Sequence, residues 1–116
     1  MSLLTKQQIL SADDRATEDV DVKEWGGTAR VATMSASDRD KWEQDTYGDG
    51  TTKMEDYRAR FVALCLVDDK GARLFTDKEV AQLGAKSAAA LDRVFRVAQR
   101  INALGSAEVE AAEKKS

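Results

Sequence analysis

The stretch from Leu74 to Leu104, in which signals for the start and end of helices follow each other without a gap, constrains the fold of this chain more than any other part of its sequence. Thr76 stands three residues before Glu79, the spacing of a capping box, in which each side chain binds the backbone N–H of the other residue. A short helix is therefore predicted to begin at Asp77, and Gly84 is predicted to end it in a left-handed conformation.

A longer helix is predicted to follow, with Ser87 as its cap, and to run to Leu104 before Gly105. Five of its apolar residues recur at helical spacing and predict one buried stripe: Leu91, Val94, Phe95, Ala98 and Ile101. Arginines at similar spacing line another face: Arg93, Arg96 and Arg100. This arginine face fits either a solvated helix flank or a docking strip for an acidic helix or a neighbouring subunit.

A β-hairpin is predicted around the glycine pair at 26–27, because apolar residues alternate with polar ones on both sides of it. A two-residue turn would place Val22 opposite Val31 on one apolar face. The same register leaves Lys23 beside Arg30 on the outer face, an unfavourable pair that suggests a third strand or an acidic partner nearby.

Further helices are predicted on either side of the hairpin. Thr5 and Gln8 have capping-box spacing for a short N-terminal helix. Ser35 or Ser37 can start a helix that contains Trp42. A third helix is expected from about 52 to 67, because apolar residues recur there at helical spacing: Met54, Tyr57, Phe61, Leu64 and Cys65.

The composition restricts the function of this 116-residue chain, which is long enough for one domain. A net charge of −3 argues against binding to nucleic acid through bulk charge, and the acidic stretch 13–24 is expected to be a solvated face.

Histidine is absent and Cys65 is expected to be buried, which argues against catalysis and metal binding. A calcium loop between Asp45 and Asp56 fits poorly, because Tyr47 occupies a position that needs an oxygen-rich ligand. Without a signal peptide or a bilayer-spanning stretch, a soluble cytosolic protein without cofactor is expected.

Three segments together resemble the small tail assembly chaperones of long-tailed bacteriophages: MSLLTKQQILSADD, VDVKEWGGTARVATM and LFTDKEVAQLGAKSAAALDRVFRVAQRINAL. The resemblance covers about Ser2 to Leu104, and its motifs are structural, with no catalytic signature among them. It implies an α+β fold, mostly helical, with one β-hairpin packed against about four helices. A single domain is expected over 1–105, followed by a flexible tail over 106–116.

The resemblance also implies a role. Such proteins bind the tape measure protein, keep it soluble and help to recruit tail-tube subunits in the host cytoplasm, and they are absent from the mature virion. Members of the family from phages and prophages are often made together with a longer form, which a programmed frameshift produces. In this chain, the codons for Glu113 to Lys115 could contain the slippery sequence that such a frameshift needs. Weak self-association is compatible with this role. The alternative is a connector or tail-completion protein retained in the virion. No family motif for client binding transfers to this sequence, so four residues are proposed as contacts: Trp42, Arg93, Arg96 and Arg100.

Overall fold

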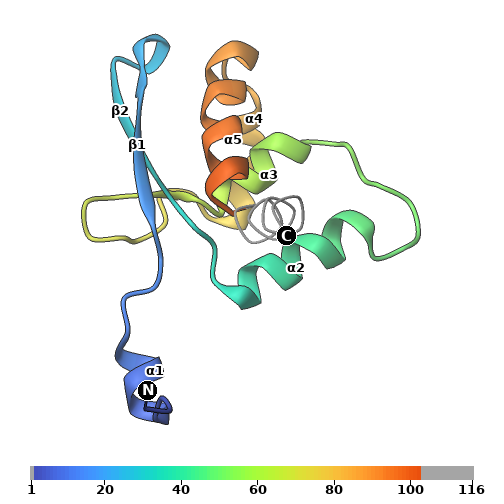
Figure 1. Cartoon of the computed structure of the whole chain (residues 1–116). Helices are drawn as coiled ribbons and strands as arrows, with labels where there is room; N and C mark the ends of the chain where they lie inside the picture. The colour runs from blue at the N-terminus through green and yellow to red at the C-terminus, as the bar shows by residue number, and fades with distance from the viewer. Residues whose placement is uncertain (1, 103–116) are drawn as a thin grey trace, which may run out of the picture.

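The computed structural model describes residues 2–102, in which helices pack against one face of a small antiparallel sheet (Figure 1). The described elements are, in order, α1 (Lys6–Ser11), β1 (Thr17–Val22), η1 (Lys23–Trp25), β2 (Gly27–Ala32), α2 (Ala36–Tyr47), α3 (Tyr57–Ala63), β3 (Leu66–Val67), η2 (Asp77–Glu79), α4 (Val80–Gly84) and α5 (Ala88–Asn102). Helix α5 contacts β1 and β2 on one side and α3 on the other. The α+β fold predicted from the sequence is confirmed.

The hairpin forms, but its predicted register is wrong. Val22 lies opposite Gly27 rather than Val31, because the turn is the three-residue 3₁₀ helix η1, closed by Gly26 at φ 76°. The partner of Val22 is thus four positions away from the predicted one. Because side chains alternate with a period of two, an even shift keeps the same residues on the same face. Val22 and Val31 are accordingly both fully buried.

On the outer face of the sheet, Arg30 has both an acidic neighbour and a third strand beside it, the two alternatives that the sequence suggested. It lies opposite Asp19, and its Nε is 2.8 Å from Asp19 Oδ1. On its other side, Arg30 pairs with Val67 of β3, the third strand. The predicted contact with Lys23 does not form, since Lys23 belongs to η1.

The predicted helix from 52 to 67 is wrong at both ends. It begins late because Asp56 adopts a left-handed conformation, with φ 50°, directly before α3. It ends early because β3 pairs with β2, and the Cys65 carbonyl accepts a 2.8 Å hydrogen bond from the Ala32 N–H. Met54, predicted to be core, is 63% exposed.

The helix caps predicted at Ser35, Thr5 and Thr76 are present. Ser35 Oγ accepts a hydrogen bond from the backbone of α2, and Thr5 forms its capping box with Gln8 at the start of α1. The Thr76–Glu79 capping box precedes η2, which continues into α4.

Gly84 does not end its helix in a left-handed conformation as predicted. It remains helical within α4, and the following residue, Ala85, is also right-handed. A Cβ at position 84 would lie 2.6 Å from Oδ1 of the exposed Asp56 side chain, so this carboxylate would have to rotate away from any larger residue there. Ser87 Oγ accepts a hydrogen bond from the Ala90 N–H of α5, as predicted.

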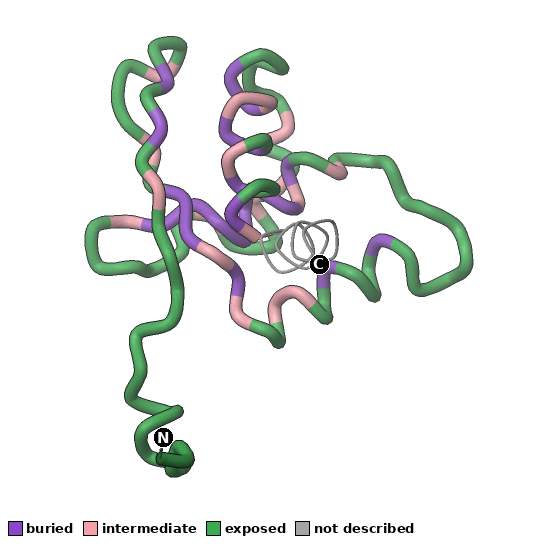
Figure 2. The backbone as a smooth tube through the Cα atoms, in the orientation of Figure 1, coloured by how far each residue is buried: buried purple, intermediate pink, exposed green. Residues whose placement is uncertain are grey.

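The described part of α5 ends at Asn102, so its predicted end at Leu104 and the predicted tail over 106–116 lie outside the described residues. The predicted α5 stripe is confirmed: Leu91, Val94, Phe95, Ala98 and Ile101 are all buried. Figure 2 shows the buried positions gathered where α5 faces the sheet and α3. Cys65 is fully buried among them, and burial raises the pKa of its thiol to about 12.

Helix α1 stands apart from this body, joined to β1 by residues 12–16 (Figure 1). None of its residues is buried, and Figure 2 shows the whole N-terminal segment as exposed. None of the helices in residues 2–102 combines the length and the apolar character needed to cross a membrane.

Candidate partner-contact surface

Two residues of the arginine face bind the chain's own acidic hairpin. Arg93 of α5 forms a bidentate contact with Glu24 of η1, with N–O distances of 2.7 and 3.0 Å. Arg100 pairs with Glu18 of β1. The acidic stretch that was expected to be solvated therefore supplies the carboxylates that pair with the arginine face, and these ion pairs hold α5 against the hairpin.

The pKa values of the hairpin carboxyl groups reflect these contacts. Hydrogen bonds from Arg93 are the largest cause that lowers the pKa of Glu24 to about 2. The pKa of Asp19 is lowered chiefly by its hydrogen bond with Arg30. Both carboxylates thus remain charged well below neutral pH.

Arg96 differs from its two neighbours because its side chain is 77% exposed and does not reach the hairpin. Its Nε lies 2.8 Å from Asp92 Oδ2, one turn earlier in α5. The other oxygen of Asp92 is 3.3 Å from Arg58 of α3, whose guanidinium lies over the Phe95 ring at 5.6 Å. Arg96 and Arg58 therefore place two cationic groups on one exposed part of the α3–α5 face.

Trp42 lies mostly inside the molecule, with 8% of its surface exposed. Its ring meets those of Tyr47, Tyr57 and Phe61 edge to face, with centroid distances of 5.7, 5.4 and 5.0 Å. Its Nε1–H is buried with no hydrogen-bond acceptor among the described residues. Trp42 mainly joins α2 to α3, and the rest of its surface faces a groove.

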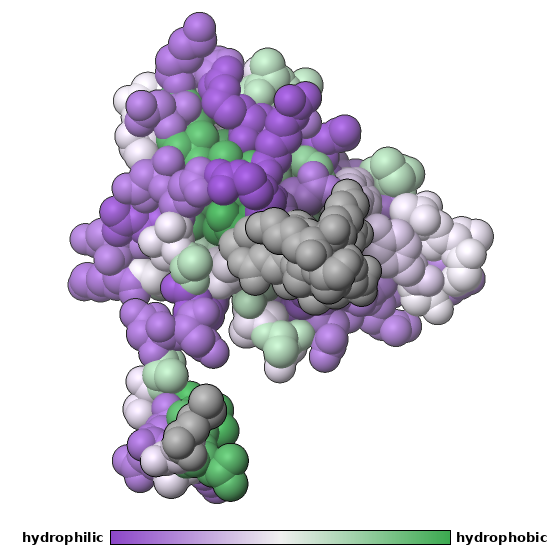
Figure 3. Space-filling model, in the orientation of Figure 1, coloured by the Kyte–Doolittle hydropathy of each residue, from purple (hydrophilic) through white to green (hydrophobic). Residues whose placement is uncertain are grey.

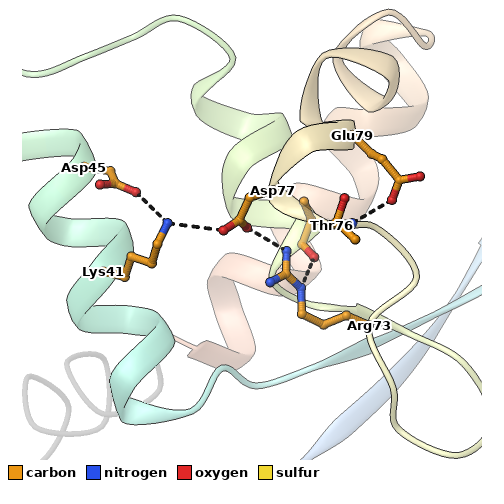
Figure 4. Close-up of polar contacts among 7 residues, drawn as sticks. Lys41, Asp45, Arg73, Thr76, Asp77 and Glu79 are labelled. Atoms are coloured by element: carbon orange, nitrogen blue, oxygen red, sulfur yellow. Dashed lines mark hydrogen bonds and ion pairs between the residues drawn. The ribbon is translucent and has the colours of Figure 1, made fainter.

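This groove, the α2 groove, has a volume of about 950 Å³ and lies between α2, the segment 48–56 and the η2–α4 unit. A chain of ion pairs closes one side of it (Figure 4). Lys41 Nζ is 3.2 Å from both Asp45 and Asp77, and Asp77 also lies 3.1 Å from Arg73. The pKa of Asp77 is lowered first by Arg73 and then by Lys41. Because Arg73 also donates to the Ala63 carbonyl, the network links α2, η2 and the end of α3.

A second hollow, of about 610 Å³, shares Met54 and Asp56 with the α2 groove, and Arg58 and Arg96 also line it. We call the combined area the Trp42–Arg96 surface and define it by Trp42, Met54, Arg58 and Arg96. The fold thus brings together two of the four residues proposed from the sequence, while Arg93 and Arg100 point toward the hairpin.

Sequence reasoning missed Met54, because it placed this residue on the buried face of a long helix. The Asp49-Gly50 turn lies just before that helix, with Gly50 at φ 85° and Asp49 Oδ1 accepting a hydrogen bond from the Thr51 N–H, but a turn at these positions does not indicate where the next helix begins. Within residues 2–102, no group of three or more His, Cys, Asp or Glu side chains could hold a metal ion.

The hairpin, the crossing helix α5 and the short α3 define a small α+β fold that is also found in a phage tail assembly protein. The structure of the bacteriophage HK97 tail assembly chaperone matches this chain with a TM-score of 0.59, over 82% of this chain and 90% of that one, at 16% sequence identity. The resemblance seen in the sequence is therefore confirmed at the level of the fold. No family model matches the sequence, and no curated protein matches it either.

Proposed function

We propose that this chain is a bacteriophage tail assembly chaperone, which binds the tape measure protein, keeps it soluble and helps to recruit tail-tube subunits in the host cytoplasm. The observation that supports this role most strongly is the likeness to the HK97 tail assembly chaperone, because it extends over 90% of that protein.

The Trp42–Arg96 surface is the proposed client contact. It combines the exposed edge of a buried indole, a methionine that is 63% exposed and the cationic groups of Arg58 and Arg96. A flexible thioether adapts to apolar side chains of different shapes, and guanidinium groups bind carboxylates on the polar flank of an amphipathic helix. Such a surface suits a long helical client whose sequence varies along its length. Many weak contacts along one client then give a stable complex through avidity.

Co-expression with the tape measure protein of the same phage tests this proposal. We expect the unaltered chain to keep that protein in the soluble fraction, and the double variant Met54→Glu/Arg96→Glu to lose this effect while retaining its helicity. The matched control is Lys70→Glu, an exposed charge reversal in the turn after β3. An insoluble client beside the unaltered chain would refute the chaperone role. A double variant as effective as the unaltered chain would refute only the proposed surface.

Tail-tube recruitment is assigned to a longer, frameshifted form. The proposed site of departure, near Glu113, lies outside the described residues. Intact mass measurement of the products of the gene with its native downstream DNA tests this form, and a single 116-residue product would refute it. We further propose that the chain is absent from the mature virion. Detection of the chain in purified virions would instead favour the connector function.

A further inference from the structure

The N-terminal arm, defined as residues 2–11, exposes an unusual amount of apolar surface. Leu3, Leu4, Ile9 and Leu10 are 93, 71, 56 and 73% exposed. Figure 3 shows this hydrophobic surface on a lobe that is separate from the body. The arm nevertheless contains a helix, α1, whose first turn is capped by the Thr5–Gln8 capping box with hydrogen bonds of 2.9 and 3.1 Å. Among the described residues α1 has none that is buried, and an exposed apolar patch of this kind is typical of a segment that binds elsewhere.

A groove in the body has matching chemistry. This apolar groove, of about 430 Å³, lies between β2, the segment after β3 and α4. The side chains of Trp25, Ala29, Leu74 and Phe75 form much of its wall, and Leu74 is 52% exposed. Lys86 is the one charged residue that lines it among the described residues, and none of their carboxylates lies within 4 Å of its ammonium group.

The charges next to the arm complement this groove. Asp13 and Asp14 follow the arm after Ala12, and both are exposed. Neither forms an ion pair with any described residue. An arm whose apolar residues enter the groove can therefore bring a carboxylate to Lys86 at the edge of the contact.

The arm is held away from the hairpin-tip end of the groove in its own chain. Arg15, which follows Asp14, donates two hydrogen bonds to the Thr33 carbonyl, at 2.9 and 2.6 Å. This anchor leaves only residues 12–14 as a free connection, which spans roughly 10 Å when extended. Trp25 and Gly27 of the groove lie at the hairpin tip, at the far end of β1, and a six-residue strand is about 20 Å long.

We propose that the N-terminal arm of one copy docks in the apolar groove of a second copy, with Asp13 or Asp14 facing Lys86. Reciprocal docking produces a dimer, and docking in one direction produces a longer chain of subunits. Because the contact involves no client, its test is independent of the chaperone function proposed above.

Sedimentation of the full chain over a range of concentrations tests the docking. The average mass of the unaltered chain should rise with concentration, and Leu4→Ser/Leu10→Ser should remain monomeric because it removes two apolar contacts. Both substitutions lie on exposed positions, so the circular dichroism of the body should not change. Met54→Ser is the matched control, an exposed apolar residue outside the apolar groove that should associate normally.

A charge exchange then tests the orientation. Lys86→Glu should weaken association by about tenfold, and Asp13→Lys/Asp14→Lys in the same chain should restore it, since opposite charges again meet at the groove edge. An unaltered chain that is monomeric at every concentration would overturn the proposal, as would an arm variant that associates normally. Failure of the charge exchange to restore association would overturn the assigned contact with Lys86.

Discussion

Replacement of Trp42 measures how much this residue contributes to the packing of the fold. Trp42→Ala removes a ring that is 8% exposed and that meets three other aromatic rings edge to face. A buried Trp→Ala substitution costs about 3–5 kcal/mol of stability. At roughly 4 °C per kcal/mol for a domain of this size, the melting temperature should fall by about 12–20 °C.

Trp42→Phe should have a much smaller effect. It keeps one aromatic ring among its neighbours and removes an N–H that is buried without an acceptor in the described structure. The smaller apolar area costs about 1–2 kcal/mol. Removal of an unsatisfied buried donor returns about 1–3 kcal/mol, so the two effects nearly cancel.

Urea unfolding followed by far-ultraviolet circular dichroism measures both variants on one scale. The free energy of unfolding of Trp42→Phe should stay within about 1 kcal/mol of that of the unaltered chain, well above that of Trp42→Ala. Equal destabilisation by the two substitutions would contradict this prediction, because it would mean that the indole N–H has a hydrogen-bond acceptor in the folded protein. A loss of less than about 1 kcal/mol for Trp42→Ala would show that the aromatic cluster does not hold α2 in place.

Two further predictions concern pH and packing. The pKa of Glu24 falls from 4.5 to about 2 on folding, so its contribution to stability is present above about pH 4.5 and disappears as the pH falls toward 2. Melting temperatures measured across this window should decline, and Glu24→Gln should reduce the decline; an equal decline in the variant would contradict the assignment. Gly84→Ala should change stability by no more than about 1 kcal/mol in chemical unfolding, because alanine is the better helix former and its Cβ would meet only the end of the exposed Asp56 side chain, which can rotate away. A loss of more than about 2 kcal/mol would instead show that the Asp56 carboxylate is held in place.

The sequence predicted the local features of this fold well, and for a common reason. The caps at Thr5, Ser35, Thr76 and Ser87 each depend on residues within three positions along the chain. Such contacts form whatever the rest of the molecule does, so their sequence spacing is sufficient to predict them. The buried stripe of α5 was equally clear, because its period is long enough to be distinguished from a strand.

The errors have a non-local cause. Residues 61–67 are all buried, so no period in their sequence distinguishes a helix from a strand. The choice depends on β2, which lies more than thirty residues earlier and pairs with Leu66 and Val67. The predicted hairpin register was wrong because nothing in the sequence distinguished a two-residue turn from the 3₁₀ turn that forms.

The same limit applies to the candidate site. Trp42 and Arg96 were proposed from the sequence as separate residues on two helices. Their position on neighbouring hollows depends on Met54, which is exposed only because α3 begins as late as Tyr57. The engagement of Arg93 and Arg100 by the hairpin likewise required the three-dimensional arrangement of α5 across β1 and η1.

The two ion pairs between α5 and the hairpin should also limit which partners can bind Arg93 and Arg100. Glu24 and Glu18 belong to the same chain as Arg93 and Arg100, so they compete with any external carboxylate at the effective concentration of a tethered ligand, which is on the order of millimolar or higher. An acidic segment that offers no more than a carboxylate gains little by displacing them. Arg96 pairs only within its own helix among the described residues, so it can be engaged without opening the hairpin contact. We therefore expect an acidic partner to bind more readily at the face of α5 that carries Arg96 than at the face that meets the hairpin.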